Sequence, residues 1–257
     1  MDGKCKFSDK KCRFIHDPNF CKDYYKGKCR YGDKCKFNHF VTLYGIKNTV
    51  DYKPRKTLPD MRILVNQQPE TQSDVILVTD LLTTDEANHY FDAIMNHVRD
   101  RKDLWKSWHG DNHLIADDHQ EWKKDCPEFQ ELINRIESYF QMKTRATRLN
   151  WFRAGDDFKP YHHDAAAVKP DKAKTQNITI GLNLGADRVI SFEHAKHKTI
   201  IDLPLRNGTM YAFMRDVNVV WRHGVPQESG KGEERISVID WGYTEKVGNE
   251  QSDVAAK

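Results

Sequence analysis

The chain has 257 residues, 38% hydrophobic and 31% charged, which is enough for one substantial core and a small appendage. Its 14 Gly and 9 Pro form no tract repeats, which excludes a fibrous protein. No apolar run approaches the ~18 residues of a membrane-spanning helix, so we expect no membrane partner. The first residues lack the apolar stretch of a secretory signal. We therefore expect an intracellular protein, in the nucleus or cytoplasm, with reduced thiols.

Charge is distributed unevenly along the chain. Residues 1–40 carry 11 Lys/Arg against 5 Asp, a net charge of +6, whereas the remaining residues carry 30 Lys/Arg against 33 Asp/Glu. The basic segment 1–40, called the basic head below, precedes a mildly acidic body, which indicates that the head binds a polyanion.

The basic head contains a set of potential zinc ligands. Three cysteines and one histidine follow the spacing C-x7-C-x5-C-x3-H, at Cys21, Cys29, Cys35 and His39. Three thiolates and one imidazole make a closed tetrahedral shell, which suits structural zinc. A disulfide knot is the alternative, but a reducing compartment and the terminal histidine argue against it. So short a segment cannot bury a core, and metal binding would supply most of its folding energy.

This spacing resembles the CCCH zinc-finger family, whose members mostly bind single-stranded RNA. Aromatic rings, which stack on unpaired bases, alternate in the same segment with cations, which neutralise phosphates. The aromatic residues are Tyr24, Tyr25, Tyr31 and Phe37. An incomplete copy precedes it at Cys5, Cys12 and His16. Either the sequence begins inside a tandem array and this is a partial zinc site, or the half-finger binds no metal.

Residues 1–40 therefore form a predicted zinc-finger region, 41–74 a polar, proline-punctuated linker, 75–245 a catalytic body and 246–257 a disordered tail. In the body, residues 75–78 are predicted to form a strand. Thr84 is expected to cap an amphipathic helix with apolar residues spaced by three and four, from Ala87 to Val98. A second helix should start after Asp125, with Pro127 in its first turn.

From Arg145 onwards the pattern changes to alternation and short apolar runs. The predicted strands are 147–153, 177–184, 188–193, 198–203, 209–214, 219–223 and 235–241. Short strands at this density indicate a double-sheet jelly roll of the cupin-like kind. With helices flanking one outer face, the fold class is α+β, plus the small N-terminal zinc-finger segment.

Three potential metal ligands lie in this region. His162 and Asp164 are two residues apart, so on a strand both would face the same side, and His223 lies near the end of a predicted strand. Two histidines and one carboxylate form the facial triad of non-haem Fe(II) oxygenases. Taken alone, an H-x-D pair in a chain with 12 His is more often a solvated loop.

Two further residues suit a dicarboxylate cosubstrate. Arg235 heads the last predicted strand and could grip a distal carboxylate bidentately. Asn150 precedes His162 by twelve residues and could reach the same molecule from a neighbouring strand. The alternative for Arg235 is a surface ion pair with Glu233 or Asp240.

Together these motifs resemble the AlkB-like 2-oxoglutarate/Fe(II)-dependent dioxygenases over residues 75–243. The motifs are Asn150…Gly155…His162-x-Asp164, the segment Leu203–Tyr211, the segment Trp221–Val225, and Arg235-Ile-Ser237. The resemblance implies a double-stranded β-helix. It implies that His162, Asp164 and His223 are catalytic ligands of Fe(II), and that Arg235, Asn150 and Ser237 bind 2-oxoglutarate. It also implies that molecular oxygen is a co-substrate and that N-methylated nucleobases are demethylated.

The sequence departs from the family pattern at three places. The family usually has a second arginine six residues after the first, where this chain has Trp241. Trp151 and Phe152 stand where a tyrosine often follows the asparagine. Ala166 stands where several nucleic-acid demethylases have an acidic residue, so base selectivity cannot be transferred.

Residues 101–124 are predicted to be irregular and to hold the substrate, since this segment forms a nucleotide-recognition lid in the family. Trp105, Trp108 and His109 are the candidates, and core packing is the alternative for the tryptophans. We expect a monomeric demethylase that favours RNA over DNA. The alternatives are an RNA-binding protein with a catalytically inactive body and an oxygenase that hydroxylates a protein side chain.

Overall fold

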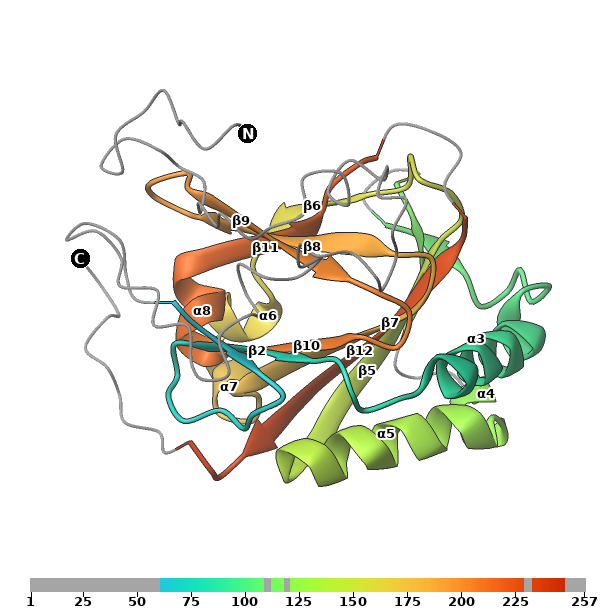
Figure 1. Cartoon of the computed structure of the whole chain (residues 1–257), viewed down its shortest axis with the longest axis horizontal. Helices are drawn as coiled ribbons and strands as arrows, with labels where there is room; N and C mark the ends of the chain where they lie inside the picture. Colours follow the sequence, from blue (N-terminus) through green and yellow to red (C-terminus); the bar gives the residue numbers. More distant parts are fainter. Residues whose placement is uncertain (1–60, 109–111, 118–120, 229–232, 248–257) are drawn as a thin grey trace, which may run out of the picture.

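The computed structural model describes residues 61–108, 112–117, 121–228 and 233–247 (Figure 1). The zinc ligands predicted at Cys21, Cys29, Cys35 and His39, the half-finger Cys5, Cys12 and His16, and His109 lie outside the described residues. No helix in the described ranges is both long and apolar enough to cross a membrane.

Two facing sheets form the body, as the jelly-roll prediction requires. The larger sheet has the order β1-β2-β10-β7-β12-β5-β4-β3, and the smaller has the order β6-β11-β8-β9. The larger comprises β1 (Arg62–Val65), β2 (Asp74–Val78), β3 (Lys106–Ser107), β4 (Leu114–Ala116), β5 (Met142–Phe152), β7 (Ile178–Gly185), β10 (Met210–Met214) and β12 (Arg235–Thr244). The smaller comprises β6 (Lys159–His162), β8 (Arg188–His194), β9 (Ile200–Leu205) and β11 (Trp221–Val225). In Figure 1 the smaller sheet lies over the larger one.

Helices cover the outer face of the larger sheet. Helix α3 (Thr84–Val98) begins with a capping box in which Thr83, one residue before the predicted Thr84, accepts from the Glu86 amide and Glu86 accepts from the Thr83 amide. Helix α5 (Pro127–Phe140) starts at the predicted proline. Figure 1 shows both helices on the side of β5 and β12 that faces away from the smaller sheet. The α+β prediction with flanking helices is confirmed.

Alternation along the central strands separates two cores. Along β12, Ile236 and Val238 belong to the cluster that packs under α3 and α5, whereas Ser237 and Ile239 line a pocket between the sheets. Along β10, Met210 and Ala212 face the helices, whereas Tyr211 and Phe213 belong to the second cluster. Because successive side chains point to opposite faces, one face of each strand stabilises the helix layer and the other face is available for chemistry.

Several boundaries differ from the prediction. Part of the predicted linker, Arg62–Val65, forms β1 and pairs in parallel with β2, where the bidentate contact between Arg62 and Asp74 joins the two strands. At the other end, Val247 is buried in the helix-side core, so the body extends past residue 245. Residues 215–220 form α8 (Arg215–Val220) instead of starting a strand.

Short elements occupy residues 101–124, the segment predicted to be irregular. These are β3, β4 and α4 (Trp122–Asp125). Two further short helices, α6 (Ala165–Val168) and α7 (Pro170–Ala173), follow β6. Periodicity cannot identify elements of two to four residues, because they complete less than one repeat of either pattern.

A glycine on β7 makes room for a buried tyrosine. A Cβ built at Gly181 would overlap the ring and hydroxyl of Tyr211, which lies opposite it in the β10–β7 register. Tyr211 is 4% exposed and lines the pocket between the sheets. Gly181 therefore lets the Tyr211 ring lie flat across the sheet.

A buried histidine attaches β4 to the rest of the molecule. His113 is fully buried, stacks parallel on Phe152 at a centroid distance of 4.8 Å, and its Nδ1 lies 3.1 Å from the Phe158 carbonyl. Burial lowers the pKa of His113 to about 3, and the nearby Lys159 acts in the same direction. The imidazole is therefore neutral in the folded protein at ordinary pH.

Substituting Gly181→Ala should lower the free energy of unfolding by about 1–3 kcal/mol, because the added methyl displaces Tyr211 within a packed region. Urea unfolding measures this change. In a Tyr211→Leu background the same substitution should cost less, because leucine does not reach the overlapping position. An equal penalty in both backgrounds would contradict the contact.

Acidification should destabilise the protein through His113. Between pH 6.5 and the folded-state pKa of about 3, the unfolded chain binds the proton and the folded chain does not. Stability therefore falls as the pH drops below 6.5, by about 2 kcal/mol from this residue at pH 5. The variant His113→Phe keeps a stacking ring and should lose about that much less between pH 7 and 5 in urea unfolding. Substituting the exposed His89→Phe should leave the wild-type pH dependence in place.

Candidate functional site

Three elements bring the predicted triad together at one end of the pocket. His162 ends β6 and pairs in register with His223 on β11, and Asp164 precedes the first turn of α6. Asp164 Oδ1 lies 3.6 Å from His162 Nε2 and 3.7 Å from His223 Nε2. All three potential ligand atoms lie within 4.8 Å of one another.

Asp164 reaches this position differently from the prediction. Strand β6 ends at His162, so strand alternation does not orient Asp164; the residue is the N-cap of α6. Its amide donates to Asn218 Oδ1 at 2.9 Å, and the Asn218 carbonyl lies 2.6 Å from His163 Nδ1. Asn218, on α8, thus holds the turn between the two ligands and directs His163 away from them.

Hydrogen bonds determine which nitrogen of His162 faces the cluster. His162 Nδ1 lies 2.9 Å from the Pro160 carbonyl, which can only accept, so Nδ1 carries the proton. Nε2, which faces Asp164, therefore carries the lone pair. A backbone carbonyl that orients a histidine in this way is typical of metal sites.

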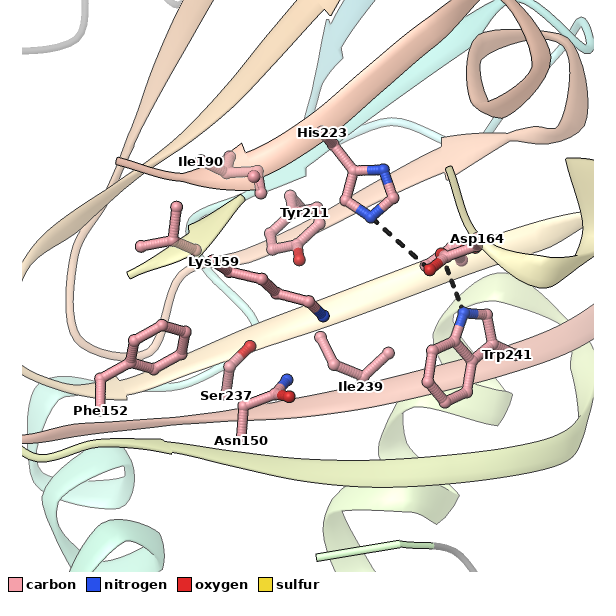
Figure 2. A pocket seen from close by; sticks show the side chains of 13 residues that line it. Asn150, Phe152, Lys159, Asp164, Ile190, Tyr211, His223, Ser237, Ile239 and Trp241 are labelled. Atoms are coloured by element: carbon pink, nitrogen blue, oxygen red, sulfur yellow. Dashed lines mark hydrogen bonds and ion pairs between the residues drawn. The ribbon is translucent and has the colours of Figure 1, made fainter. Parts of the chain in front are cut away.

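The two oxygens of Asp164 have separate partners. Oδ2 accepts from the Trp241 indole at 2.9 Å and from the Thr179 hydroxyl at 3.1 Å, and Oδ1 faces the histidines. Figure 2 shows Asp164 between His223 and Trp241. Trp241, which replaces the second arginine of the family, therefore orients the carboxylate.

Charge states at the cluster suit metal binding. Burial alone would raise the pKa of Asp164, but His223 and His162 outweigh it and hold the pKa well below the usual range. Burial lowers the pKa of His223 well below its ordinary value; His162 adds to this effect and Asp164 opposes it. An ionised carboxylate and neutral imidazoles are the forms that bind a divalent metal. This donor set fits Fe(II).

A buried guanidinium packs on Phe152, which lines the end of the pocket away from Asp164. Arg235 is 1% exposed, and its Nε and Nη1 have no hydrogen-bond partner among the described residues. The predicted alternative, an ion pair with Glu233 or Asp240, is absent from the described part of the chain. The guanidinium carbon lies 4.6 Å from the centre of the Phe152 ring. Burial lowers the pKa of Arg235 to about 9, so it stays charged at neutral pH.

Unpartnered donors on a buried cation require an anion. The guanidinium therefore fits a carboxylate, as predicted for 2-oxoglutarate. Asn150 and Ser237 are opposite each other in the β12–β5 register, are both buried, and line the pocket between Phe152 and Asp164 (Figure 2). Four of the six residues predicted for iron and 2-oxoglutarate thus line this pocket, while His162 adjoins it through His223 and Arg235 through Phe152.

The residues predicted to contact the substrate lie in different surroundings. Trp105 packs against the helix-side core, 5.0 Å from the Trp151 ring, and its indole donates to the Val98 carbonyl at 2.9 Å. The substrate prediction for Trp105 is therefore wrong, because an indole with its polar atom and one face already satisfied packs as core. Trp108 lies near the pocket, with Arg148 at 4.9 Å and Lys159 at 5.7 Å from its ring centre.

Among the pocket residues that were not predicted as site residues are Tyr211, Lys159 and Trp241. Tyr211 was detectable, since alternation within 209–214 places it on the same face as Phe213. Lys159 gave no such signal, because a lysine at the start of a strand is usually exposed. The hydrogen bond from Trp241 to Asp164 joins residues 77 positions apart, and no local pattern predicts it.

A second group of ligand-type residues lies at the ends of α3 and α5. His97, Cys126 and Glu128 also have ligand atoms within 4.8 Å of one another. The Cys126 thiol donates to Glu128 at 3.7 Å, and burial raises its pKa. Because the protonated thiol is a poor ligand, this group lacks the charge state found at the triad.

Comparisons with known proteins agree with this architecture. Residues 19–39 match the family model for the CCCH-type zinc finger. A search of curated protein sequences gave no match. Among solved structures, the chain resembles a prolyl hydroxylase from Trichoplax adhaerens in complex with a hypoxia inducible factor oxygen degradation domain peptide fragment. The TM-score is 0.51 at 10% identity, over 67% of this chain and 84% of that one.

The chain also resembles OsALKBH1, with a TM-score of 0.51 and 11% identity over 68% of this chain and 100% of that one. A prolyl-4-hydroxylase from Pseudomonas putida gives a TM-score of 0.44 at 14% identity, over 65% and 91% of the two chains. At these identities the likeness shows the fold, a cupin-like jelly roll, and the chemistry must be argued from the residues of the site.

Proposed function

We propose that this protein is a 2-oxoglutarate/Fe(II)-dependent dioxygenase that oxidatively demethylates N-methylated nucleobases, with RNA favoured over DNA. The observation that carries the proposal is a pocket with a two-histidine, one-carboxylate cluster at one end and, at the other end, the Phe152 ring against which a buried guanidinium with unpartnered nitrogens packs. A metal ligand set with open positions and a distant cation match a cosubstrate that chelates iron at one end and carries a carboxylate at the other.

In this proposal each group of residues has a defined task. His162, Asp164 and His223 would hold Fe(II), and Arg235, Asn150 and Ser237 would hold 2-oxoglutarate. The bound iron and cosubstrate supply the activation of molecular oxygen for hydroxylation of a methyl group, which then leaves as formaldehyde. Trp241 and Thr179 fix the Asp164 carboxylate through Oδ2. The apolar lining, including Phe152, Ile190 and Ile239, excludes water.

Nucleic acid is favoured as the substrate by two observations. The zinc-finger match coincides with the basic head, where Cys21, Cys29, Cys35 and His39 would bind zinc. The Arg148 guanidinium lies 4.9 Å from the centre of the Trp108 ring and 5.4 Å from that of Trp241, so an aromatic and cationic surface adjoins the pocket. Such surfaces stack unpaired bases and contact phosphates. Single-stranded RNA is favoured because members of the CCCH zinc-finger family mostly bind it.

Hydroxylation of a protein side chain is the second candidate. The specific observation in its favour is that the prolyl hydroxylase and OsALKBH1 give the same TM-score of 0.51, so the fold does not separate the two substrate classes. The two activities differ in their products, so a mass-spectrometric assay distinguishes them.

A screen of N-methylated RNA and DNA oligonucleotides with Fe(II) and 2-oxoglutarate should show loss of a methyl group together with succinate. His162→Ala and Asp164→Ala should each lower turnover by at least about 100-fold, because each removes a metal ligand. His89→Ala, an exposed histidine on α3, is the control and should keep full activity. An iron-loaded protein that demethylates no oligonucleotide but adds one oxygen to a peptide would favour the second candidate.

Deleting residues 1–40 should weaken RNA binding and flatten its salt dependence, because the deletion removes 11 cationic side chains. Fluorescence anisotropy of a labelled single strand at several salt concentrations measures both effects. Deleting residues 248–257 is the control, since that segment has one lysine against one aspartate and one glutamate. An unchanged salt slope without the head would contradict its role as the RNA-binding segment.

A further inference from the structure

Lys159 is a buried cation that lines the pocket, in addition to the Arg235 guanidinium beside it. It begins β6, three residues before His162, and its backbone pairs with Val225 on β11. The side chain is 8% exposed and lines the pocket with Asp164 and His223. Figure 2 shows the ammonium group extending into the pocket, on the way to the end that holds the triad.

The Lys159 ammonium forms no hydrogen bond or ion pair with any residue in the described part of the chain. Burial lowers its pKa to about 8; Arg148 and Arg235 act in the same direction, and Asp164 opposes them. A buried ammonium without a paired anion is costly, yet Lys159 lines the pocket, and the Arg235 guanidinium, with two unpartnered nitrogens, packs on the pocket residue Phe152. Two such cations at one pocket favour a ligand with two negative charges.

The positions of the two cations indicate which end of the ligand each would meet. Arg235 stacks on Phe152 at the end away from the triad, so it suits the distal carboxylate. The Lys159 ammonium extends toward the end of the pocket lined by Asp164 and His223 (Figure 2), so its charge lies toward the triad. Trp241 occupies the place of the second family arginine and is engaged with Asp164, so it offers no cation there.

We propose that Lys159 binds the carboxylate at the 2-oxo acid end of the cosubstrate, replacing from β6 the cation that this chain lacks at position 241 on β12. This inference rests on the proposed function, since it assumes that a 2-oxo acid occupies the pocket. Lys159 is then a binding residue for one end of the molecule, and Arg235 for the other end.

Two ligands distinguish binding at the two ends of the cosubstrate. 2-Oxoglutarate has both carboxylates, whereas 2-oxobutyrate keeps the 2-oxo acid end and has a hydrogen atom in place of the distal carboxyl group. Calorimetry on the full chain loaded with Mn(II) measures both affinities. Lys159→Met should weaken both ligands, by roughly 10- to 100-fold, because each loses a charge-assisted hydrogen bond. Arg235→Met should weaken 2-oxoglutarate by a similar factor and leave 2-oxobutyrate within about twofold.

Two controls accompany this comparison. Lys172→Met, an exposed lysine on α7, should leave both affinities unchanged. Lys159→Met should also raise the melting temperature of the ligand-free protein, because it replaces a buried unpaired charge with an apolar side chain of similar length. Lys159→Arg keeps the charge and should bind 2-oxobutyrate more tightly than Lys159→Met does.

The outcomes distinguish this inference from the proposed function. Unchanged affinity for both ligands in Lys159→Met, or loss confined to 2-oxoglutarate, would overturn the assignment of Lys159 and leave the proposed function standing. A wild-type chain that binds Mn(II) but neither 2-oxo acid would overturn both.

Discussion

A buried carboxylate with a different set of partners on each oxygen is the feature on which the site depends. Asp164 Oδ2 is held by an indole and a hydroxyl from β12 and β7, so Oδ1 can face only the two imidazoles. If those donors were missing, the carboxyl group could rotate, and the geometry of the three ligands would be lost. The larger sheet thus orients a ligand that lies just beyond the end of a strand of the smaller one.

The helix layer and the pocket use opposite faces of the same strands. Apolar residues of β7, β10 and β12 pack under α3 and α5, and the alternate positions supply Thr179, Tyr211 and Ser237. The core that holds the strands in place therefore also fixes the positions of the pocket side chains, because both sets of side chains lie on the same strands. Polar groups on the inner face cost stability, which the apolar outer face offsets.

Sequence patterns predicted most of this arrangement. Alternation and helical spacing located both long helices and most long strands, and the motifs singled out four residues that line the pocket, namely Asn150, Asp164, His223 and Ser237. The features that were not predicted depend on contacts between segments that are distant in the sequence. Strand β1 becomes recognisable through its pairing with β2, Lys159 is buried because β6 faces the larger sheet, and Trp241 gains its role from Asp164. None of these leaves a periodic signal, since each arises from tertiary packing rather than from local propensity.

The two walls of the pocket belong to different sheets. His223 and Lys159 come from β11 and β6, whereas Ser237 and Asn150 come from β12 and β5. A molecule that contacts both walls therefore also links the two layers, in addition to the hydrogen bonds of Asp164 to Trp241 and Thr179. Occupancy then contributes to folding free energy in proportion to the logarithm of ligand concentration. Cellular supply of the small molecule thereby becomes a determinant of how long the folded chain persists.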